Sequence, residues 1–220
     1  SLAIAACEGG GAVDSRKGAE APAATAEEGR EEGVAATTVQ GDITDPDEVD
    51  ALFDDAEETL GTVDVLVNSV GDFDARHWES VEWASWRRVV ESTFYGTVLC
   101  SRRALDGMRD QGWGRVVNIG FADCDRRHAH PGNFPYFVGK TGVLLFTRML
   151  AGDTQNDGVT VNAVSPFAVE NTVSDVSDLP RGRAASFEDV IAPVLFFCSE
   201  AAGYISGQNV AVDGGRLPEV

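Results

Sequence analysis

Tyr136 and Lys140 are the residues of this sequence with the clearest chemistry. They stand four positions apart in a predicted helix, so their side chains share one face of it. A phenol with an ordinary pKa of about 10 is a poor acid or base near neutral pH, and a neighbouring ammonium favours its ionised form. The pair therefore predicts proton exchange with a carbonyl or alcohol oxygen, with Tyr136 as general acid/base and Lys140 lowering its pKa.

A second group of chemically capable residues crowds one predicted loop: Asp123, Cys124, Asp125, His128 and His130. Their spacing fits no standard zinc frame, so we predict no metal site. The four cysteines of the chain stand far apart and form no C-x-x-C pair, which predicts free thiols: Cys7, Cys100, Cys124 and Cys198.

The elements that must position these residues alternate between strand and helix from about residue 34 onward. Strands are predicted at 34–40, 63–67, 114–119, 159–164 and 208–212, and helices at 45–60, 83–109, 136–151 and 188–199. Alternation with apolar strands predicts an α/β fold of three layers, a doubly wound, Rossmann-like parallel sheet covered by helices on both faces. The length of 220 residues predicts a single domain over 1–220.

Charge excludes some partners. The chain has 36 acidic and 17 basic residues, a formal net charge of −19, and no large basic cluster, so we expect no nucleic-acid partner. An acidic surface poor in lysine is typical of a salt-loving source, because dense salt screens its self-repulsion. We find no apolar stretch long enough for a bilayer and no signal-peptide pattern, which predicts no membrane contact and a soluble, cytoplasmic protein.

Six motifs in order make the chain resemble the short-chain dehydrogenase/reductase family from about Gly33 to Gly215. They are Gly41-Asp42-Ile43-Thr44, the segment Asp64 to Gly71 with Asn68, Gly114 to Ile119 with Asn118, Tyr136-x-x-x-Lys140, Val161 to Pro166, and Tyr204 to Gly215. The resemblance implies a nicotinamide cofactor that exchanges hydride at the carbon next to the oxygen served by Tyr136, with Lys140 also holding the cofactor ribose.

The resemblance also implies further cofactor contacts. Asp42 and Ile43 are expected beside the adenine, Asn68 and Gly71 along the cofactor cleft, and Ser165 and Pro166 beside the nicotinamide. A small residue followed by arginine, Ser15-Arg16, suits a ribose 2′-phosphate, so NADP is the expected cofactor and NAD remains possible. If the alignment with the family shifts by one residue, Asp14 stands at the position where NAD-preferring relatives carry an acidic residue.

The sequence departs from the family at its start. We find no match in the sequence to the family's opening strand and its Thr-Gly-x-x-x-Gly-x-Gly turn. Residues 2–13 are instead predicted to be the first helix followed by a shortened second strand. In the alternative interpretation, Leu2 to Ala6 is the first strand and Gly9 to Gly11 form a substitute loop that leads to a helix near Ala19 to Glu32.

Further departures touch catalysis. Gly120 and Phe121, or Asp123 if counted back from Tyr136, stand where the family has a serine that hydrogen-bonds the substrate oxygen. Thr93 replaces the asparagine that helps to hold a proton-relay water. The substrate lid, between Val169 and Phe187, is about ten residues short of the family's, and Phe167 replaces a glycine.

The sequence thus predicts an NADP-preferring oxidoreductase that interconverts a small ketone or 3-oxo compound and its alcohol. The alternative is a non-catalytic family member that acts as a binding or assembly module. A homodimer or homotetramer is expected through the helices at 83–109 and 136–151, whose surplus apolar residues are Phe94, Val98, Leu105, Val143, Phe146 and Met149.

Overall fold

The computed structural model describes residues 2–5, 26–27, 29–125, 130–172 and 177–216. Five strands in this part of the chain form one sheet in the order β1-β2-β3-β4-β5, and every pairing is parallel. The strands are β1 Leu2–Ala5, β2 Val65–Asn68, β3 Gly114–Ile119, β4 Val159–Pro166 and β5 Asn209–Val212. The predicted parallel α/β sheet is confirmed, and four of the five predicted strands are found with both ends within two residues of their expected bounds.

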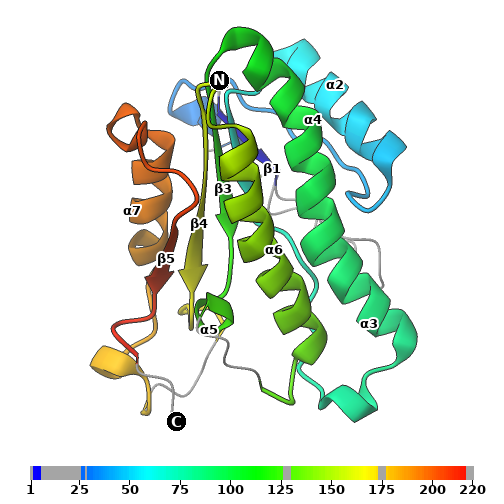
Figure 1. Cartoon of the computed structure of the whole chain (residues 1–220), viewed down its shortest axis with the longest axis vertical. Helices are drawn as coiled ribbons and strands as arrows, with labels where there is room; N and C mark the ends of the chain where they lie inside the picture. The colour runs from blue at the N-terminus through cyan, green and yellow to red at the C-terminus, as the bar shows by residue number, and fades with distance from the viewer. Residues whose placement is uncertain (1, 6–25, 28, 126–129, 173–176, 217–220) are drawn as a thin grey trace.

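Helices cover both faces of this sheet (Figure 1). One long helical segment begins with α3 Trp83–Val90, passes through a π-helical turn at Glu91–Tyr95 and continues as α4 Gly96–Gln111, so the predicted helix over 83–109 is confirmed. The other helices are α2 Pro46–Leu60, α5 Ala122–Asp125, α6 Phe134–Asp153 and α7 Phe187–Cys198, with 3-10 turns at Trp78–Ser80, Pro180–Gly182 and Glu200–Ala202. No helix in the described ranges is long and apolar enough to cross a membrane.

The three layers follow from the alternation of side chains along the strands. Val116 of β3 packs into a cluster with residues of α2, α4 and α6, whereas Val117 packs on the opposite face with Phe197 of α7. Successive side chains of a strand point to opposite faces, so one apolar strand supplies both cores. Both residues are 1% exposed. Both faces of the sheet are therefore buried. The edge formed by the carboxyl ends of the strands is the part that remains for polar side chains.

Local sequence signals set where two of the helices begin. Asp45 accepts hydrogen bonds from the backbone N–H groups of Asp47 and Glu48, and Pro46 occupies the first turn of α2. At α7, Ser186 and Asp189 form a reciprocal capping box. Both caps use side chains that the sequence places directly before an apolar periodic segment.

Two expectations for the N-terminal part are wrong. Leu2–Ala5 is a strand, not the start of a helix, and it pairs in parallel with β2 from Leu2↔Val65 to Ala5↔Asn68. This pairing satisfies the backbone groups on the open edge of β2, which a helix would leave unpaired. The alternative interpretation of a first strand therefore agrees with the structure over these residues, while Gly9 to Gly11 lie outside the described residues.

The second correction concerns residues 34–40, which were expected to form a strand and instead lie as an irregular segment. A strand needs a neighbouring strand with which its backbone N–H and C=O groups can form hydrogen bonds. The described residues provide no such strand beside this segment. Of the alternative helix near Ala19 to Glu32, residues 26–27 and 29–31 are helical and the rest falls outside the described ranges or in a turn.

The apolar surplus expected on the long helices is present, but two of its members differ. Leu105 and Val143 are 4% and 1% exposed because they pack into the chain's own core. Met149 is exposed as expected, at 54%, and Tyr95 and Leu145, which were not expected, are also exposed, at 51% and 67%. The remaining expected residues are half-buried: Phe94, Val98 and Phe146.

Gly96→Ala tests how closely α4 packs against the turn that precedes α2. A Cβ at Gly96 would lie 2.3 Å from Cδ1 of the fully buried Ile43, so we expect the free energy of unfolding to fall by about 1–3 kcal/mol. Gly152→Ala in α6 is the control, because nothing lies within 4 Å of its added Cβ. Urea unfolding followed by circular dichroism measures both, and equal midpoints for the two variants would contradict this packing.

Candidate active site

Lys140 lies at the carboxyl ends of β2 and β3, where α6 crosses them. Its Nζ donates to the carbonyl oxygen of Ile119, the last residue of β3, at 2.6 Å and to that of Val70, just beyond β2, at 3.4 Å. The side chain is 3% exposed. Burial disfavours the charged form and lowers the pKa of Lys140 to about 8.

Tyr136 lies one helical turn before Lys140, and aromatic rings surround it. The ammonium of Lys140 lies over the face of the Tyr136 ring, 5.4 Å from its centroid. The rings of Phe73 and Phe121 meet Tyr136 edge-on, with centroids at 5.3 and 5.9 Å. Burial raises the pKa of Tyr136 well above its ordinary value. We expected a lowered pKa from the neighbouring ammonium, and the pKa of Tyr136 is instead raised, because burial of the phenol dominates.

The start of α6, and with it Tyr136, is fixed by a loop from another part of the chain. The backbone N–H of Asn133 donates to the carbonyl of Arg76 at 3.1 Å, and that of Trp78 donates to the carbonyl of Pro131 at 2.9 Å. Asn133 itself has φ of +54°, which turns the chain sharply into the helix. The position of Tyr136 therefore depends on residues about 60 positions earlier in the chain.

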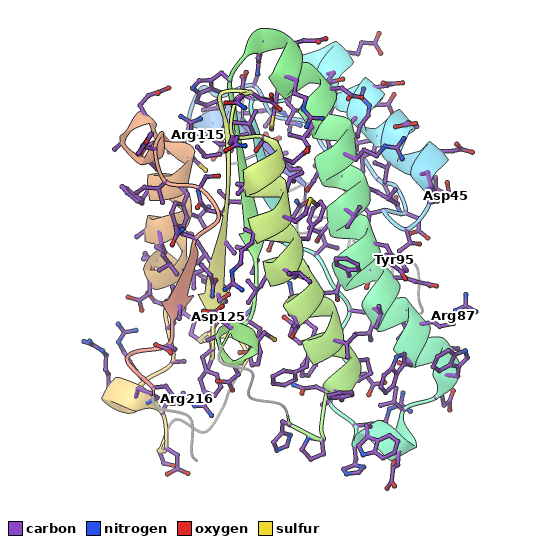
Figure 2. The ribbon with its side chains drawn as sticks, viewed as in Figure 1. Asp45, Arg87, Tyr95, Arg115, Asp125 and Arg216 are labelled. Atoms are coloured by element: carbon purple, nitrogen blue, oxygen red, sulfur yellow. The ribbon has the colours of Figure 1, made fainter. Side chains whose placement is uncertain are left out.

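The positions expected to hold a serine are occupied differently. Phe121 places its ring against Tyr136, and Asp123 is buried and forms an ion pair with Arg216. A Cβ at Gly120 would lie 2.2 Å from Oγ of Ser165, so this position has no room for a serine. The carboxylate of Asp123 is thus directed to the C-terminal segment, whose Arg216 lies at the carboxyl end of the sheet, the same end as Asp125 of α5 (Figure 2).

Thr93 is buried in the π-helical turn between two glycines. A Cβ added at Gly71 would lie 2.5 Å from Oγ1 of Thr93, and a Cβ added at Gly139 would lie 2.9 Å from Cβ of Thr93. Gly71 also has φ of +146°, which a residue with a side chain rarely adopts. The Thr93 hydroxyl is fully buried and has no hydrogen-bond partner in the described part of the chain. Thr93 therefore serves here as a close packing contact for Gly71 and Gly139.

Asn68 takes part in a buried polar network and does not face a cleft. Its Nδ2 donates to Oδ1 of Asn118 at 2.8 Å and to Oγ of Ser101 at 3.0 Å, while Asn118 donates to Oγ1 of Thr147 at 2.9 Å. Asn68 and Asn118 are register partners on β2 and β3. Two polar residues at matched positions of buried strands are the sequence signal for this network, which we missed.

The other residues expected at the cofactor are placed as follows. Asp42 accepts hydrogen bonds from both the backbone N–H and the hydroxyl of Thr44, and Ile43 is buried against Gly96. Asp42 and Thr44 line an open groove of about 310 Å³ with α3 residues that include Arg87 and Arg88.

Ser165 donates from its hydroxyl to Asn209 at 2.6 Å, and Pro166 ends β4. Ser15 and Arg16, like Asp14, lie outside the described residues.

The loop considered for a metal has other partners in the structure. Asp123 pairs with Arg216, Asp125 pairs with Arg148, and Nδ1 of His130 accepts from the backbone N–H of Gly132. Cys124 is buried, which raises its thiol pKa to about 11. His128 is outside the described residues, and the described ones form no group of three metal-ligating side chains.

The residues around Lys140 fit the ribose end of a nicotinamide cofactor. An ammonium has three donors, and two of them reach the carbonyls of Ile119 and Val70. The third is left for a ribose hydroxyl, at the carboxyl edge of the sheet where cofactors of this fold class bind. The residues expected near the other parts of such a cofactor, Gly9 to Gly11, Ser15 and Arg16, lie outside the described residues.

Comparison with known proteins gives consistent matches. A family model described as Enoyl-(Acyl carrier protein) reductase matches residues 3–216. An acetoacetyl-CoA reductase of Allochromatium vinosum is 30% identical over 207 residues, covering 88% of this chain and 83% of that protein.

A cis-4-hydroxycyclohexanecarboxylate dehydrogenase of Sinomonas cyclohexanicum is 34% identical over 197 residues, covering 84% of this chain and 78% of that protein. A crystal structure described as a short-chain alcohol dehydrogenase from Sinorhizobium meliloti 1021 aligns with a TM-score of 0.82 at 27% sequence identity, covering 92% of this chain and 82% of that one.

Lys140→Met tests the buried ammonium through the pH dependence of stability. Between about pH 8 and pH 10.5, Lys140 is protonated in the unfolded chain but has lost its proton in the folded chain. The unfolding free energy of the wild type should therefore rise with pH across this window relative to the variant, by a total on the order of 3 kcal/mol. Urea unfolding of both proteins at a series of pH values measures the difference, and a difference that stays flat would contradict the burial.

Proposed function

Because the chain belongs to the short-chain dehydrogenase/reductase family, we propose that it is an NADP-preferring oxidoreductase that interconverts a ketone or 3-oxo compound and its alcohol. The observation that carries this proposal is the buried Lys140 ammonium over the ring of Tyr136 at the carboxyl edge of the sheet. The activity of a relative on acetoacetyl-CoA, as its name states, supports a 3-oxo compound as the substrate class. We propose that residues 1–220 act as one domain.

Tyr136 supplies the proton that carbonyl reduction needs. A bound nicotinamide supplies the hydride. The phenol is protonated at neutral pH already at its ordinary pKa of about 10, burial raises this pKa further, and Tyr136 can donate its phenolic proton to a carbonyl oxygen. The reverse reaction needs the phenolate, which the same burial disfavours. Lys140 holds the cofactor ribose with its third donor and, as a cation beside the ring, stabilises negative charge on the phenol once the proton has left.

The preference for NADP rests on Ser15-Arg16, a small residue followed by a guanidinium that suits a 2′-phosphate. We propose a homodimer or homotetramer, supported by the exposed Tyr95, Leu145 and Met149 on the π turn and α6. The charge of −19 supports a salt-loving source, so activity is best sought in molar salt. We also propose that the protein is cytoplasmic.

A second candidate function is a non-catalytic binding or assembly module. Phe121 favours it, because its ring lies against Tyr136 where the family has a hydroxyl donor, and Asp123, the other candidate position, is held by Arg216. A missing donor of this kind commonly costs about 10² to 10³ in rate. The two candidates differ in one measurable property, which is NADPH-dependent turnover that depends on Tyr136.

Tyr136→Phe and Phe121→Ser together test the proposed function. We expect Tyr136→Phe to abolish carbonyl reduction, because it removes the proton donor and keeps the ring. Phe121→Ser should raise kcat by about 10-fold or more, because it restores a hydroxyl donor beside Tyr136.

NADPH oxidation with a panel of ketones and 3-oxo thioesters in molar salt is the measurement, with circular dichroism as the folding control. Wild-type turnover in Tyr136→Phe would refute the assignment of Tyr136. No turnover in either the wild type or Phe121→Ser would favour the binding module.

A further inference from the structure

A cavity of about 200 Å³ opens at the carboxyl ends of β4 and β5. Its apolar wall includes Phe167, Ala168 and Val212, and its rim includes Arg181 and Arg183. The carboxylates of Asp189 and Asp213 also line the cavity. The cavity therefore combines apolar side chains with charged groups of both signs, and the partners of these charged groups decide which of them a ligand could meet.

Phe167 connects this cavity to Tyr136. Its ring stacks on Phe121, with centroids 6.0 Å apart and planes 29° apart, and Phe121 in turn meets Tyr136 edge-on. On the other side, the guanidinium of Arg216 lies 4.0 Å from the centroid of Phe167. The apolar wall of the cavity thus continues, ring by ring, toward the proposed proton donor.

The charged groups at the cavity differ in whether they have ionic partners. Arg183 forms an ion pair with Asp189, which also accepts a hydrogen bond from the backbone N–H of Ser186. Asp213 accepts from the backbone N–H of Gly215 at 3.0 Å. Arg181 pairs with no carboxylate of the described residues, and its one hydrogen bond there runs from Nε to the carbonyl of Gly214 at 3.3 Å. Its terminal guanidinium nitrogens are left for a ligand.

The backbone holds Arg181 in an unusual conformation. It has φ of +62° and ψ of +10°, the left-handed region that an L-residue with a side chain rarely adopts. Gly214 has φ of +69°, and a Cβ added there would lie 2.9 Å from Cβ of Pro180. The turn at Gly214 and the turn at Pro180 therefore fit against each other only with glycine at position 214. Strained residues of this kind cluster at ligand-binding sites.

We propose that Arg181 is a specificity-determining residue that binds a carboxylate on the substrate. The substrate class is then an oxo acid whose carbonyl lies at Tyr136, whose apolar chain follows Phe167 and whose carboxylate pairs with Arg181. In a chain with a net charge of −19, a cation at the cavity rim that has no ionic partner among the described residues is the feature that an anionic substrate would recognise. This inference rests on the proposed function for the position of the carbonyl.

A series of oxo acids from 4-oxopentanoate to 7-oxooctanoate, each with its methyl ester, tests the proposal by NADPH oxidation. At the best chain length we expect kcat/KM for the acid to exceed that for the ester at least 10-fold. Arg181→Gln should bring this ratio close to one, mainly through a higher KM for the acid, and Arg181→Lys should retain part of it. Arg183→Gln is the matched control at the same rim, and we expect it to keep the ratio, because Arg183 is engaged by Asp189.

Arg181→Gly separates binding from folding, because glycine adopts the left-handed backbone without strain. We expect it to lose the preference for the acid while its melting temperature stays the same or rises. Equal use of acid and ester by the wild type, or an unchanged ratio in Arg181→Gln, would overturn the proposal and leave the proposed function standing.

A binding measurement distinguishes failure of the inference from failure of the proposed function. Saturation-transfer NMR follows the same acids on the wild type and on Arg181→Gln without any turnover. If no carbonyl compound is reduced, acid binding that is present in the wild type and lost in Arg181→Gln still supports the carboxylate site. Absence of acid binding together with absence of turnover overturns both.

Discussion

The buried ammonium of Lys140 is the interaction on which the arrangement of the site depends. A charge taken out of water is costly unless polar partners replace the water, and here the carbonyl oxygens of Ile119 and Val70 do so. Ile119 is the last residue of β3, and Val70 lies just after β2. The Lys140 ammonium therefore connects the carboxyl ends of these two neighbouring strands to α6. Tyr136 is held in place as a consequence, because it lies one turn earlier on the same face of α6.

Beneath this charge, a neutral polar network fixes the same strands from the inside. Asn68 and Asn118 bond to each other across β2 and β3, and they reach Ser101 of α4 and Thr147 of α6. A buried amide without partners would cost stability, so each of these bonds favours one register of strands and helices. The carboxyl edge of the sheet therefore has two supports, one charged and one neutral, that share β2, β3 and α6, and the neutral one also reaches α4.

Around Tyr136 the chain replaces small polar residues by aromatic rings, and this changes the chemistry of the site. The rings of Phe73 and Phe121 pack edge-on against the phenol, and burial raises its pKa. Phe167, stacked on Phe121 and covered by Arg216, extends the apolar surface away from Tyr136. The rings that stand in place of a hydroxyl donor thus form one continuous aromatic cluster beside Tyr136.

The sequence predicted those parts of the fold that local pattern encodes. The periodicity of residues 83–109 and the spacing of Tyr136 and Lys140 were sufficient to predict the long helix and the shared face of α6. The pKa direction of Tyr136 was not predictable in this way, because Phe73 comes from a segment about 60 residues away. Leu2–Ala5 was predicted as part of a helix and as a strand only in the alternative interpretation, because a short apolar segment suits either until a neighbouring strand pairs with it.

Transfer of deuterium from NADPH labelled at C4 of the nicotinamide tests the central claim most directly. Each of the two C4-labelled forms is incubated with the protein and a ketone in molar salt, and the alcohol is examined by mass spectrometry and NMR. The account predicts one deuterium on the former carbonyl carbon from one labelled form and none from the other, with transfer lost in Tyr136→Phe. An alcohol without deuterium from either form, or labelling that persists in Tyr136→Phe, would contradict it.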